Sequence, residues 1–321
     1  LGYTESQGHP QLREEVSKLY STVAPEQVMV AAPEEAIFIA MNTLLGEGDE
    51  VIVTFPGYQS LYEVARSTRC KLRFWEPRYE IGWYFETGDL EKLLTSRTKM
   101  LIINFPHNPT GAVISSKQQQ QIIKLVHESG AILFSDEMYR YLEYEEENRL
   151  PSMADLSDQA ITLCGMSKSF ALAGLRIGWL TTKNPVWMKK FLAFKDYTTI
   201  CNSAPSEILA IMGLKSREQI LRRNHDIIRN NLVILDDFFD NHRAYFEWYR
   251  PEAGPVGFPK LKTKTSANEF CHDLVKSKGV MLLPPDVYEF QGNHFRIGFA
   301  RKNIQVALEK LDEYLSETNP V

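Results

Sequence analysis

Features that define several classes of protein are missing from this sequence. The longest apolar runs, such as residues 36–41, are far shorter than the ~20 residues that a membrane-spanning helix requires. No block of Lys and Arg exceeds a few residues and the formal net charge is -5, which argues against a nucleic acid or a membrane as partner. No internal repeat, low-complexity tract or signal peptide is visible either.

Cysteine is scarce and widely spaced. The four cysteines form no Cys-x-x-Cys pair and stand at positions 70, 164, 201 and 271. This spacing indicates neither a zinc site nor a disulfide framework, so we expect no metal. A reducing, cytoplasmic location is the corresponding expectation.

The remaining composition is that of an ordinary globular protein. With 321 residues, of which 44% are hydrophobic and 24% charged, the chain is long enough for one large core and a smaller second domain. Short apolar strands at 50–54, 71–75, 100–104 and 131–135 alternate with helical patterns such as 34–45 and 117–129. This alternation predicts an α/β fold with a mainly parallel sheet covered by helices on both faces.

The pattern changes after residue 179. Helices are predicted over 185–197 and 206–214, and a long helix over 217–239 is expected to bridge two domains. The strands that follow are short, and they alternate with further helices; the predicted strands are 245–249, 256–260, 280–283 and 294–299, and the predicted helices 267–276 and 304–316. We therefore predict a large domain over 1–215 and a smaller α+β domain over 216–321.

Polar residues follow several of the predicted strands. Ligands of open α/β sheets gather outside the carboxyl ends of the strands, which selects Tyr58, the segment 104–111, the segment 136–139 and the turn around Lys168 as neighbours. Lys168 follows an apolar run within a turn of small residues. A partly desolvated lysine loses its proton readily, and its neutral amine can attack a carbonyl to form a Schiff base. The alternative is an ordinary exposed lysine.

Five short motifs support the first interpretation. They are Asn108-Pro-Thr-Gly111, Asp136-x-x-Tyr139, Ser167-Lys168, Gly174-x-Arg176-x-Gly178 and Phe295-Arg-Ile297. In this order and spacing the chain resembles the class I/II aminotransferases, which are fold-type I enzymes dependent on pyridoxal 5'-phosphate (PLP). The resemblance runs from Tyr3 to the last predicted helix, and it implies a seven-stranded sheet in the large domain.

The resemblance assigns the catalytic roles. Lys168 would form the Schiff base with PLP and then shuttle a proton as general base and acid. Asp136 would hold the proton of the pyridine nitrogen, which favours carbanion delocalisation into the ring. Tyr139 and Asn108 would donate to the phenolate oxygen of the ring. The family's Asn-Pro bond is cis, and we expect the same of Asn108-Pro109.

It also assigns binding roles. Tyr58 would stack on the pyridine ring, Arg176 would bind the phosphate, and Arg296, with Asn108 beside it, would bind the substrate α-carboxylate. Tyr3 matches a tyrosine that crosses a dimer interface, so a homodimer with shared active sites is implied, with the first ~15 residues at the interface by analogy with the family.

Three departures from the family pattern concern the phosphate. Pro33 stands at the start of the phosphate-binding helix and has no N–H to offer, so the donors begin at Glu34. The side chains of Glu34 and Glu35 are expected to face away from an anion. Gly165 replaces a common serine, which leaves Ser167 as the candidate hydroxyl. The family's N-terminal arm is missing ahead of Leu1.

We predict a PLP-dependent aminotransferase that moves an amino group between an L-amino acid and a 2-oxo acid. The alternative is a PLP-dependent lyase or cyclase of amino-acid or natural-product biosynthesis on the same fold. A PLP-binding regulator or inert scaffold is a third hypothesis, which the intact Lys168 and the lack of a visible helix-turn-helix disfavour. No second arginine is clearly suited to bind a side-chain carboxylate of the substrate, so a dicarboxylate donor is not supported.

Overall fold

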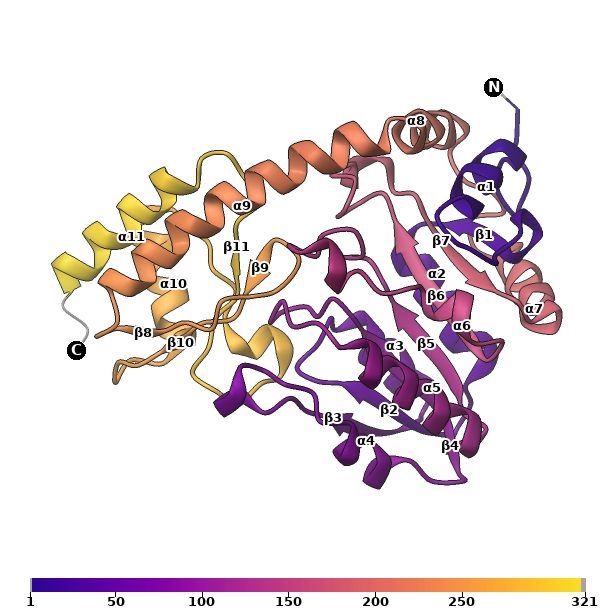
Figure 1. Cartoon of the computed structure of the whole chain (residues 1–321), viewed down its shortest axis with the longest axis horizontal. Coiled ribbons are helices and arrows are strands. Elements are labelled where there is room, and N and C mark those ends of the chain that lie inside the picture. The colour runs from indigo at the N-terminus through magenta and orange to yellow at the C-terminus, as the bar shows by residue number, and fades with distance from the viewer. Residues whose placement is uncertain (1, 319–321) are drawn as a thin grey trace.

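A seven-stranded sheet dominates the computed structural model, which describes residues 2–318 (Figure 1). Its strand order is β1-β7-β6-β5-β4-β2-β3. The strands are β1 (Val28–Ala31), β2 (Glu50–Thr54), β3 (Lys71–Trp75), β4 (Thr98–Asn104), β5 (Ile132–Asp136), β6 (Ala160–Gly165) and β7 (Gly178–Thr182). All neighbouring strands are parallel except β7, which is antiparallel to both β6 and β1. The predicted α/β fold with a mainly parallel sheet is confirmed.

Helices cover both faces of this sheet. Those that precede the long α9 are α1 (Pro10–Ser17), α2 (Pro33–Leu44), α3 (Ser60–Ser67), α4 (Thr87–Leu93), α5 (Ser116–Ser129), α6 (Met153–Leu156), α7 (Pro185–Lys195) and α8 (Ala204–Lys215). Successive strand side chains point to opposite faces. In β4, Met100 and Ile102 pack in the core beneath α2 and α3, whereas Leu101 and Ile103 pack in the core beneath α4 and α5.

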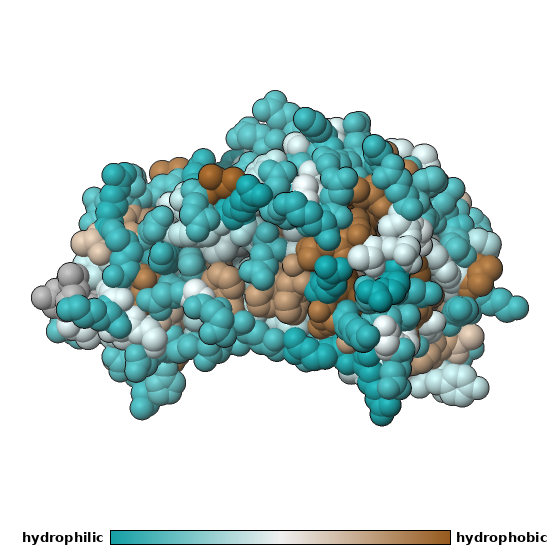
Figure 2. Space-filling model, turned by 90° about the horizontal axis from the view of Figure 1, so that it is seen from below, coloured by the Kyte–Doolittle hydropathy of each residue, from teal (hydrophilic) through white to brown (hydrophobic). Residues whose placement is uncertain are grey.

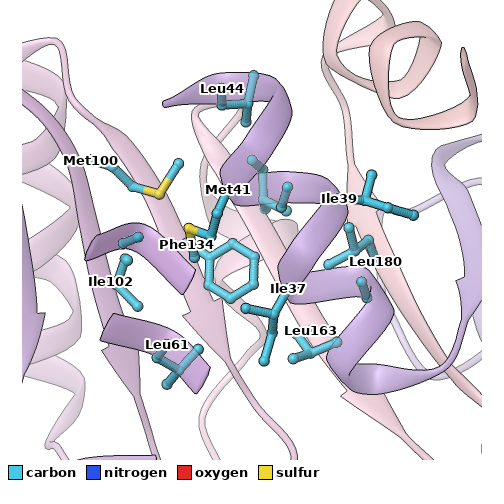
Figure 3. Packing of buried hydrophobic residues seen from close by; sticks show 14 of the residues in the cluster. Ile37, Ile39, Met41, Leu44, Leu61, Met100, Ile102, Phe134, Leu163 and Leu180 are labelled. Atoms are coloured by element: carbon cyan, nitrogen blue, oxygen red, sulfur yellow. The ribbon is translucent and has the colours of Figure 1, made fainter. Parts of the chain in front are cut away.

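Helix α2 is the central helix of the first core. Figure 3 shows Ile37 and Met41 on its sheet-facing side, close to Phe134 and Leu163 of the strands. These residues are almost completely buried. The mostly apolar sequence of α2 is therefore explained by burial against the sheet, and this packing holds the first turn of α2 beside the ends of β6 and β7.

The chain from α9 (Arg217–Asn241) onward packs around a separate core (Figure 1). This part adds α10 (Ala267–Lys278), α11 (Ile304–Thr318) and the short strands β8 (Phe246–Glu247), β9 (Val256–Gly257), β10 (Lys260–Leu261) and β11 (Ile297–Gly298). Its core also includes Tyr139, Leu142 and Tyr144 from the segment after β5. Five 3-10 turns complete the described elements: η1 (Pro25–Gln27), η2 (Tyr79–Ile81), η3 (Glu146–Asn148), η4 (Ala173–Leu175) and η5 (Pro285–Tyr288).

The strands of this second part are shorter than predicted. The predicted strand at 280–283 is wrong, because only Leu283 pairs, through an isolated bridge to Arg296. The predicted strand at 256–260 is divided into β9 and β10, which pair with β11 and β8 respectively. Short pairings of this kind contribute few backbone hydrogen bonds, so the aromatic-rich core and the helices hold this part together.

The surface is mostly hydrophilic. Seen from below, hydrophobic side chains that reach the surface gather mainly right of centre, on the side that carries the seven-stranded sheet (Figure 2). No helix within residues 2–318 is long and apolar enough to cross a membrane. The predicted domain limits at residues 1 and 321 lie outside the described residues, and the boundary near residue 215 stays a prediction.

Candidate active site

One cleft contains nearly all the residues singled out in the sequence. It lies at the carboxyl ends of β4, β5 and β6, as the rule for parallel sheets predicts. Its lining residues are Pro33, Glu34, Ile37, Tyr58, Asn104, Asn108, Asp136, Met138, Tyr139, Leu163, Ser167, Lys168, Ala173, Arg176 and Arg296. The last of these, Arg296, comes from the second part of the chain, just before β11, and is 192 positions beyond Asn104 in the sequence.

Asp136 is the last residue of β5 and is 3% exposed. One carboxylate oxygen accepts a hydrogen bond from the Met138 N–H at 3.0 Å. Burial raises the pKa of Asp136 to about 7, while the Met138 bond and the charge of Lys168 oppose the rise. Within residues 2–318 the carboxylate forms no ion pair. It is therefore a buried acid in the cleft wall that a cationic ligand would stabilise.

Asn104 joins Asp136 to Asn108 through two hydrogen bonds. Its Nδ2 donates to the backbone oxygen of Asp136 at 3.1 Å, and its Oδ1 accepts from the Asn108 N–H at 2.8 Å. Asn108 in turn accepts a hydrogen bond from Nη1 of Arg296 at 3.0 Å. We call Asn104, Asn108 and Asp136 the strand side of the cleft. The Asn108-Pro109 bond is cis, as expected.

Sequence reasoning missed the role of Asn104. It is 1% exposed, and buried amides are kept in proteins only where their hydrogen bonds are satisfied. The signal was visible as a polar residue at the end of the otherwise apolar strand 100–104. Its hydrogen bond to Asp136 was not visible, because Asp136 is 32 positions away in the sequence.

Lys168 lies in the turn that follows β6 and faces the cleft. Desolvation by the surrounding protein lowers the pKa of its amine, and the charge of Arg296 lowers it further, against the opposing effects of Glu34 and Asp136. Tyr139 is buried beside it in the lining, and burial raises the pKa of its phenol. The ring of Tyr139 packs against Gly254, which has φ +75° and leaves room for it.

The other end of the cleft contains an ion pair. Arg176 follows η4 with φ 55° and donates through Nη2 to a Glu34 carboxylate oxygen at 2.8 Å. The second carboxylate oxygen of Glu34 accepts from the Tyr58 hydroxyl at 2.5 Å. We call Glu34, Tyr58 and Arg176 the Arg176 side of the cleft. Burial opposes ionisation of Glu34, but these hydrogen bonds and the Arg176 charge leave its pKa below the ordinary value.

The expectation that both glutamates face away is therefore half wrong. Glu35 does face away, and its carboxylate accepts from the hydroxyls of Thr198 and Thr199 at 2.5 and 2.7 Å. Glu34 faces the cleft instead, because the guanidinium of Arg176 and the hydroxyl of Tyr58 converge there on one carboxylate.

Gly165 and Pro33, two of the departures from the family pattern, are parts of one packing contact. A Cβ added to Gly165 would lie 2.9 Å from the Gly178 Cα, and one added to Gly178 would lie 2.9 Å from the Pro33 ring. Strands β6 and β7 thus approach too closely here for a side chain, and the proline fills the space above them. Ser167, the candidate replacement for a serine at 165, lines the cleft with a buried hydroxyl oxygen that has no partner in the described structure.

Tyr3 is not brought to this cleft. It is 91% exposed and is absent from the lining. The adjacent Thr4 donates to Glu207 at 2.7 Å, which fastens this segment to the start of α8. Within one chain Tyr3 therefore has no contact with the predicted site.

Comparison with known proteins agrees with this geometry. The family model for aminotransferase class I and II matches residues 1–311. Capreomycidine synthase from Streptomyces vinaceus is 28% identical over 88% of this chain and 72% of its own length. An aspartate aminotransferase from Sulfurisphaera tokodaii is 28% identical over 98% of this chain and 82% of its own. The solved structure of a PLP-dependent aminotransferase from Streptococcus suis superimposes with TM-score 0.92, at 32% identity, over 99% of this chain and 84% of its own.

Proposed function

The chain belongs to the class I and II aminotransferase family and is an enzyme that transfers amino groups, and from that premise we propose its cofactor, its reaction and the roles of its residues. We propose that it binds PLP in the cleft and moves an amino group between an L-amino acid and a 2-oxo acid. The observation that carries the proposal is the meeting of a lysine amine, a buried carboxylate and an arginine in one cleft, at Lys168, Asp136 and Arg296.

The residues present fit PLP. Asp136, a buried carboxylate that has no ion pair among residues 2–318, suits a protonated ring nitrogen. The hydroxyl of Ser167, which has no partner in the described part of the chain, and the guanidinium of Arg176 suit a phosphate, with the Glu34 N–H in the first turn of α2. The pyrrolidine ring of Pro33 would pack beneath them.

The remaining contacts concern the ring itself. Asn108 and Tyr139 would donate to the ring hydroxyl, Tyr58 would cover one ring face, and the Lys168 amine would hold the aldehyde carbon. When bound, PLP supplies an electron sink for the carbanion that remains after an amino acid loses its Cα proton.

The chain itself supplies proton transfer and orientation. The lowered pKa of Lys168 increases the fraction of neutral amine, so its Nζ takes the Cα proton and later returns it. Arg296, which Asn108 holds through one hydrogen bond, binds the α-carboxylate of the amino acid or oxo acid. The Asn104 and Met138 hydrogen bonds hold Asp136 in place, where a cationic ring nitrogen would favour its ionised form.

The second candidate is a lyase or cyclase reaction in the same cleft. Similarity to capreomycidine synthase supports it, since that relative is about as similar as the aspartate aminotransferase. Product analysis distinguishes the two functions. Transamination requires a 2-oxo acid as second substrate, whereas elimination or cyclisation releases its product without one.

An apolar surface supports a homodimer. The large hydrophobic residues exposed around the N-terminal segment and α8 are Tyr3, Tyr197, Ile200, Ile208, Leu209 and Met212. Patches of this kind mark protein interfaces. We infer that a second copy covers this surface and that Tyr3 reaches the cleft of that copy. Light scattering on the purified protein should give twice the chain mass, and Met212→Glu should shift it toward the single chain.

Two further inferences concern organisation and location. We propose a domain boundary near residue 215, because the core around α9, α10 and α11 is separate from the cores on the seven-stranded sheet. We propose a cytoplasmic location from the four cysteines, all of which are free thiols.

Absorbance spectroscopy tests the main proposal. The purified protein with PLP should absorb visible light, lose that band with an amino donor and recover it with a 2-oxo acid. Lys168→Ala should have a different spectrum and no such cycle, while the exposed Lys189→Ala should behave like wild type. If no amino acid changes the band, transamination is wrong. If Lys168→Ala keeps the wild-type band and cycle, the role of Lys168 is wrong.

A further inference from the structure

A carboxylate of the protein occupies the position proposed above for the cofactor phosphate. Glu34 accepts a hydrogen bond from Arg176 at 2.8 Å and from Tyr58 at 2.5 Å. A phosphate oxygen would seek the same two donors, since both point at the space beside the first turn of α2. The ion pair is about half exposed, with side-chain exposures of 54% for Arg176 and 48% for Glu34. It can therefore open without unfolding the surrounding core.

Other donors at this position are few. Pro33, the first residue of α2, has no N–H. Gly165 has no side chain and no room for one, because Gly178 lies 2.9 Å from the position of its Cβ. Besides the N–H groups of α2 that follow Pro33, the side-chain donors that line this end are Arg176, Ser167 and the Tyr58 hydroxyl. Because Arg176 is the charged member of these three, its partner Glu34 has a large influence on how an anion binds.

Glu34 also adds negative charge where a dianion would bind. Two charges of the same sign that lie within a few ångströms of each other repel. The hydrogen bonds from Tyr58 and Arg176 keep the pKa of Glu34 below its ordinary value, so it is ionised at neutral pH. A bound phosphate must therefore either displace the Glu34 side chain or share Arg176 with it.

We propose that Glu34 is an internal anion that competes with the cofactor phosphate for Arg176, so that the phosphate group adds unusually little to cofactor affinity. This inference rests on the proposed function and concerns how tightly the cofactor is kept. In the absence of cofactor, Glu34 holds Arg176 and Tyr58 in place. When the cofactor enters, the ion pair opens, and when it closes again the cofactor is released.

The experiment compares PLP with pyridoxal, which lacks the phosphate. Both compounds carry the same aldehyde and ring. The dissociation constant of pyridoxal divided by that of PLP therefore isolates the phosphate contribution to affinity. Each is measured by equilibrium titration of the apoprotein, followed by the quenching of tryptophan fluorescence. We expect Glu34→Gln to raise the ratio by about tenfold, which is the factor for one charge-assisted hydrogen bond in a half-exposed setting.

Glu35→Gln is the matched control. It removes the same charge one residue further along the same helix, but its side chain contacts Thr198 and Thr199 instead of the cleft. The ratio should therefore stay within about twofold of wild type, because the Glu35 carboxylate is directed away from the cleft and lies 3.9 Å from the amine of the buried Lys195. If Glu34→Gln is poorly folded by circular dichroism, Glu34→Thr replaces it. Inorganic phosphate should also raise the melting temperature of the Glu34 variant more than that of wild type.

The outcomes separate the two proposals. If the wild-type protein binds neither compound, the proposed function is wrong and this inference is wrong with it. If both compounds bind but the ratio in Glu34→Gln is unchanged or lower, the proposed function stands and the competition is wrong. A lower ratio would mean that Glu34 helps to position Arg176 for the phosphate. An equal rise in Glu35→Gln would mean that net charge alone is responsible.

Discussion

The two sides of the cleft differ in how their residues are held. On the strand side, Asn104, Asn108 and Asp136 are 1%, 6% and 3% exposed, and backbone hydrogen bonds at the ends of β4 and β5 fix them. On the Arg176 side, the ion pair with Glu34 is about half exposed and joins a turn to the start of a helix. The groups proposed to bind the cofactor ring on the strand side are thus fixed at the ends of the strands, whereas the groups suited to an anion can exchange partners.

This difference has an electrostatic cost on the strand side. Asp136 has a raised pKa because it is buried, so the apoprotein holds an acid that is reluctant to ionise. Glu34 has the opposite shift, because nearby donors stabilise its charge. We infer that a cationic ligand stabilises the charge of Asp136 on the strand side. On the Arg176 side, the charges of Glu34 and Arg176 already stabilise each other. Five predictions, made on four variants, test this contrast, from the largest expected effect to the smallest.

The largest effect is expected from Asp136→Asn. The amide still accepts the Met138 hydrogen bond but carries no negative charge, so kcat for transamination should fall by about 10²-fold or more, the scale of a lost proton-transfer or charge-stabilising group. The measurement is a stopped-flow half-reaction with the amino donor. Activity within a few-fold of wild type would show that the charge of Asp136 is not used.

The same variant should reveal the cost of burying the charge. A carboxyl whose pKa rises from 3.8 to about 7 binds a proton more readily in the folded apoprotein than in the unfolded chain. Proton binding by Asp136 therefore stabilises the folded apoprotein fully below about pH 4, and this stabilisation is lost as the pH rises through 7. Apo Asp136→Asn should melt at a higher temperature than wild type at pH 8, and the difference should shrink at pH 4.

Arg296→Gln should weaken substrate binding more than cofactor binding. Removing one charge-assisted hydrogen bond to a carboxylate costs about 1.5–3 kcal/mol, so KM for the amino donor should rise by about 10- to 100-fold. The control is Arg301→Gln, which changes an exposed arginine outside the cleft. An unchanged KM, or an equal change in PLP affinity, would contradict the role assigned to Arg296.

Gly165→Ser tests the packing explanation for the Arg176 side. It restores the serine that is common in the family, but its Cβ would lie 2.9 Å from the Gly178 Cα. We expect the free energy of unfolding to fall by about 1–3 kcal/mol, the usual range for overpacking, with no gain in PLP affinity. Gly174→Ser is the matched control, because an added Cβ there meets nothing within 4 Å. Tighter PLP binding without loss of stability would overturn the explanation.

Ser167→Ala should have the smallest effect. The hydroxyl oxygen of Ser167 is buried without a partner in the described structure, so its loss should not destabilise the apoprotein. One neutral hydrogen bond to a phosphate is worth about 1 kcal/mol, so PLP should bind roughly fivefold more weakly while pyridoxal binding stays the same. If both compounds are affected equally, Ser167 does not contact the phosphate.

Local patterns predicted most of the sheet. The strands at 50–54 and 71–75 were predicted with the limits that β2 and β3 have, because apolar runs between breakers define buried strands. The segment 280–283 misled for the same reason. Val280 and Leu282 of this segment pack in the core of the second part, yet only Leu283 pairs. Local composition indicates whether a segment is buried, whereas strand pairing depends on a partner that is distant in the sequence.

By itself the sequence determined that the chain is a mainly parallel α/β protein and that Lys168, Asp136, Asn108, Tyr139, Arg176 and Arg296 are the residues to examine, because motif spacing and periodicity are local properties. Only the tertiary structure decided the hydrogen bonds of Asn104, the contact between Gly165, Gly178 and Pro33, and the inward turn of Glu34. Glu34 and Arg176 are 142 positions apart. A side chain's partner is decided by which segments the fold brings together, and no local pattern records that.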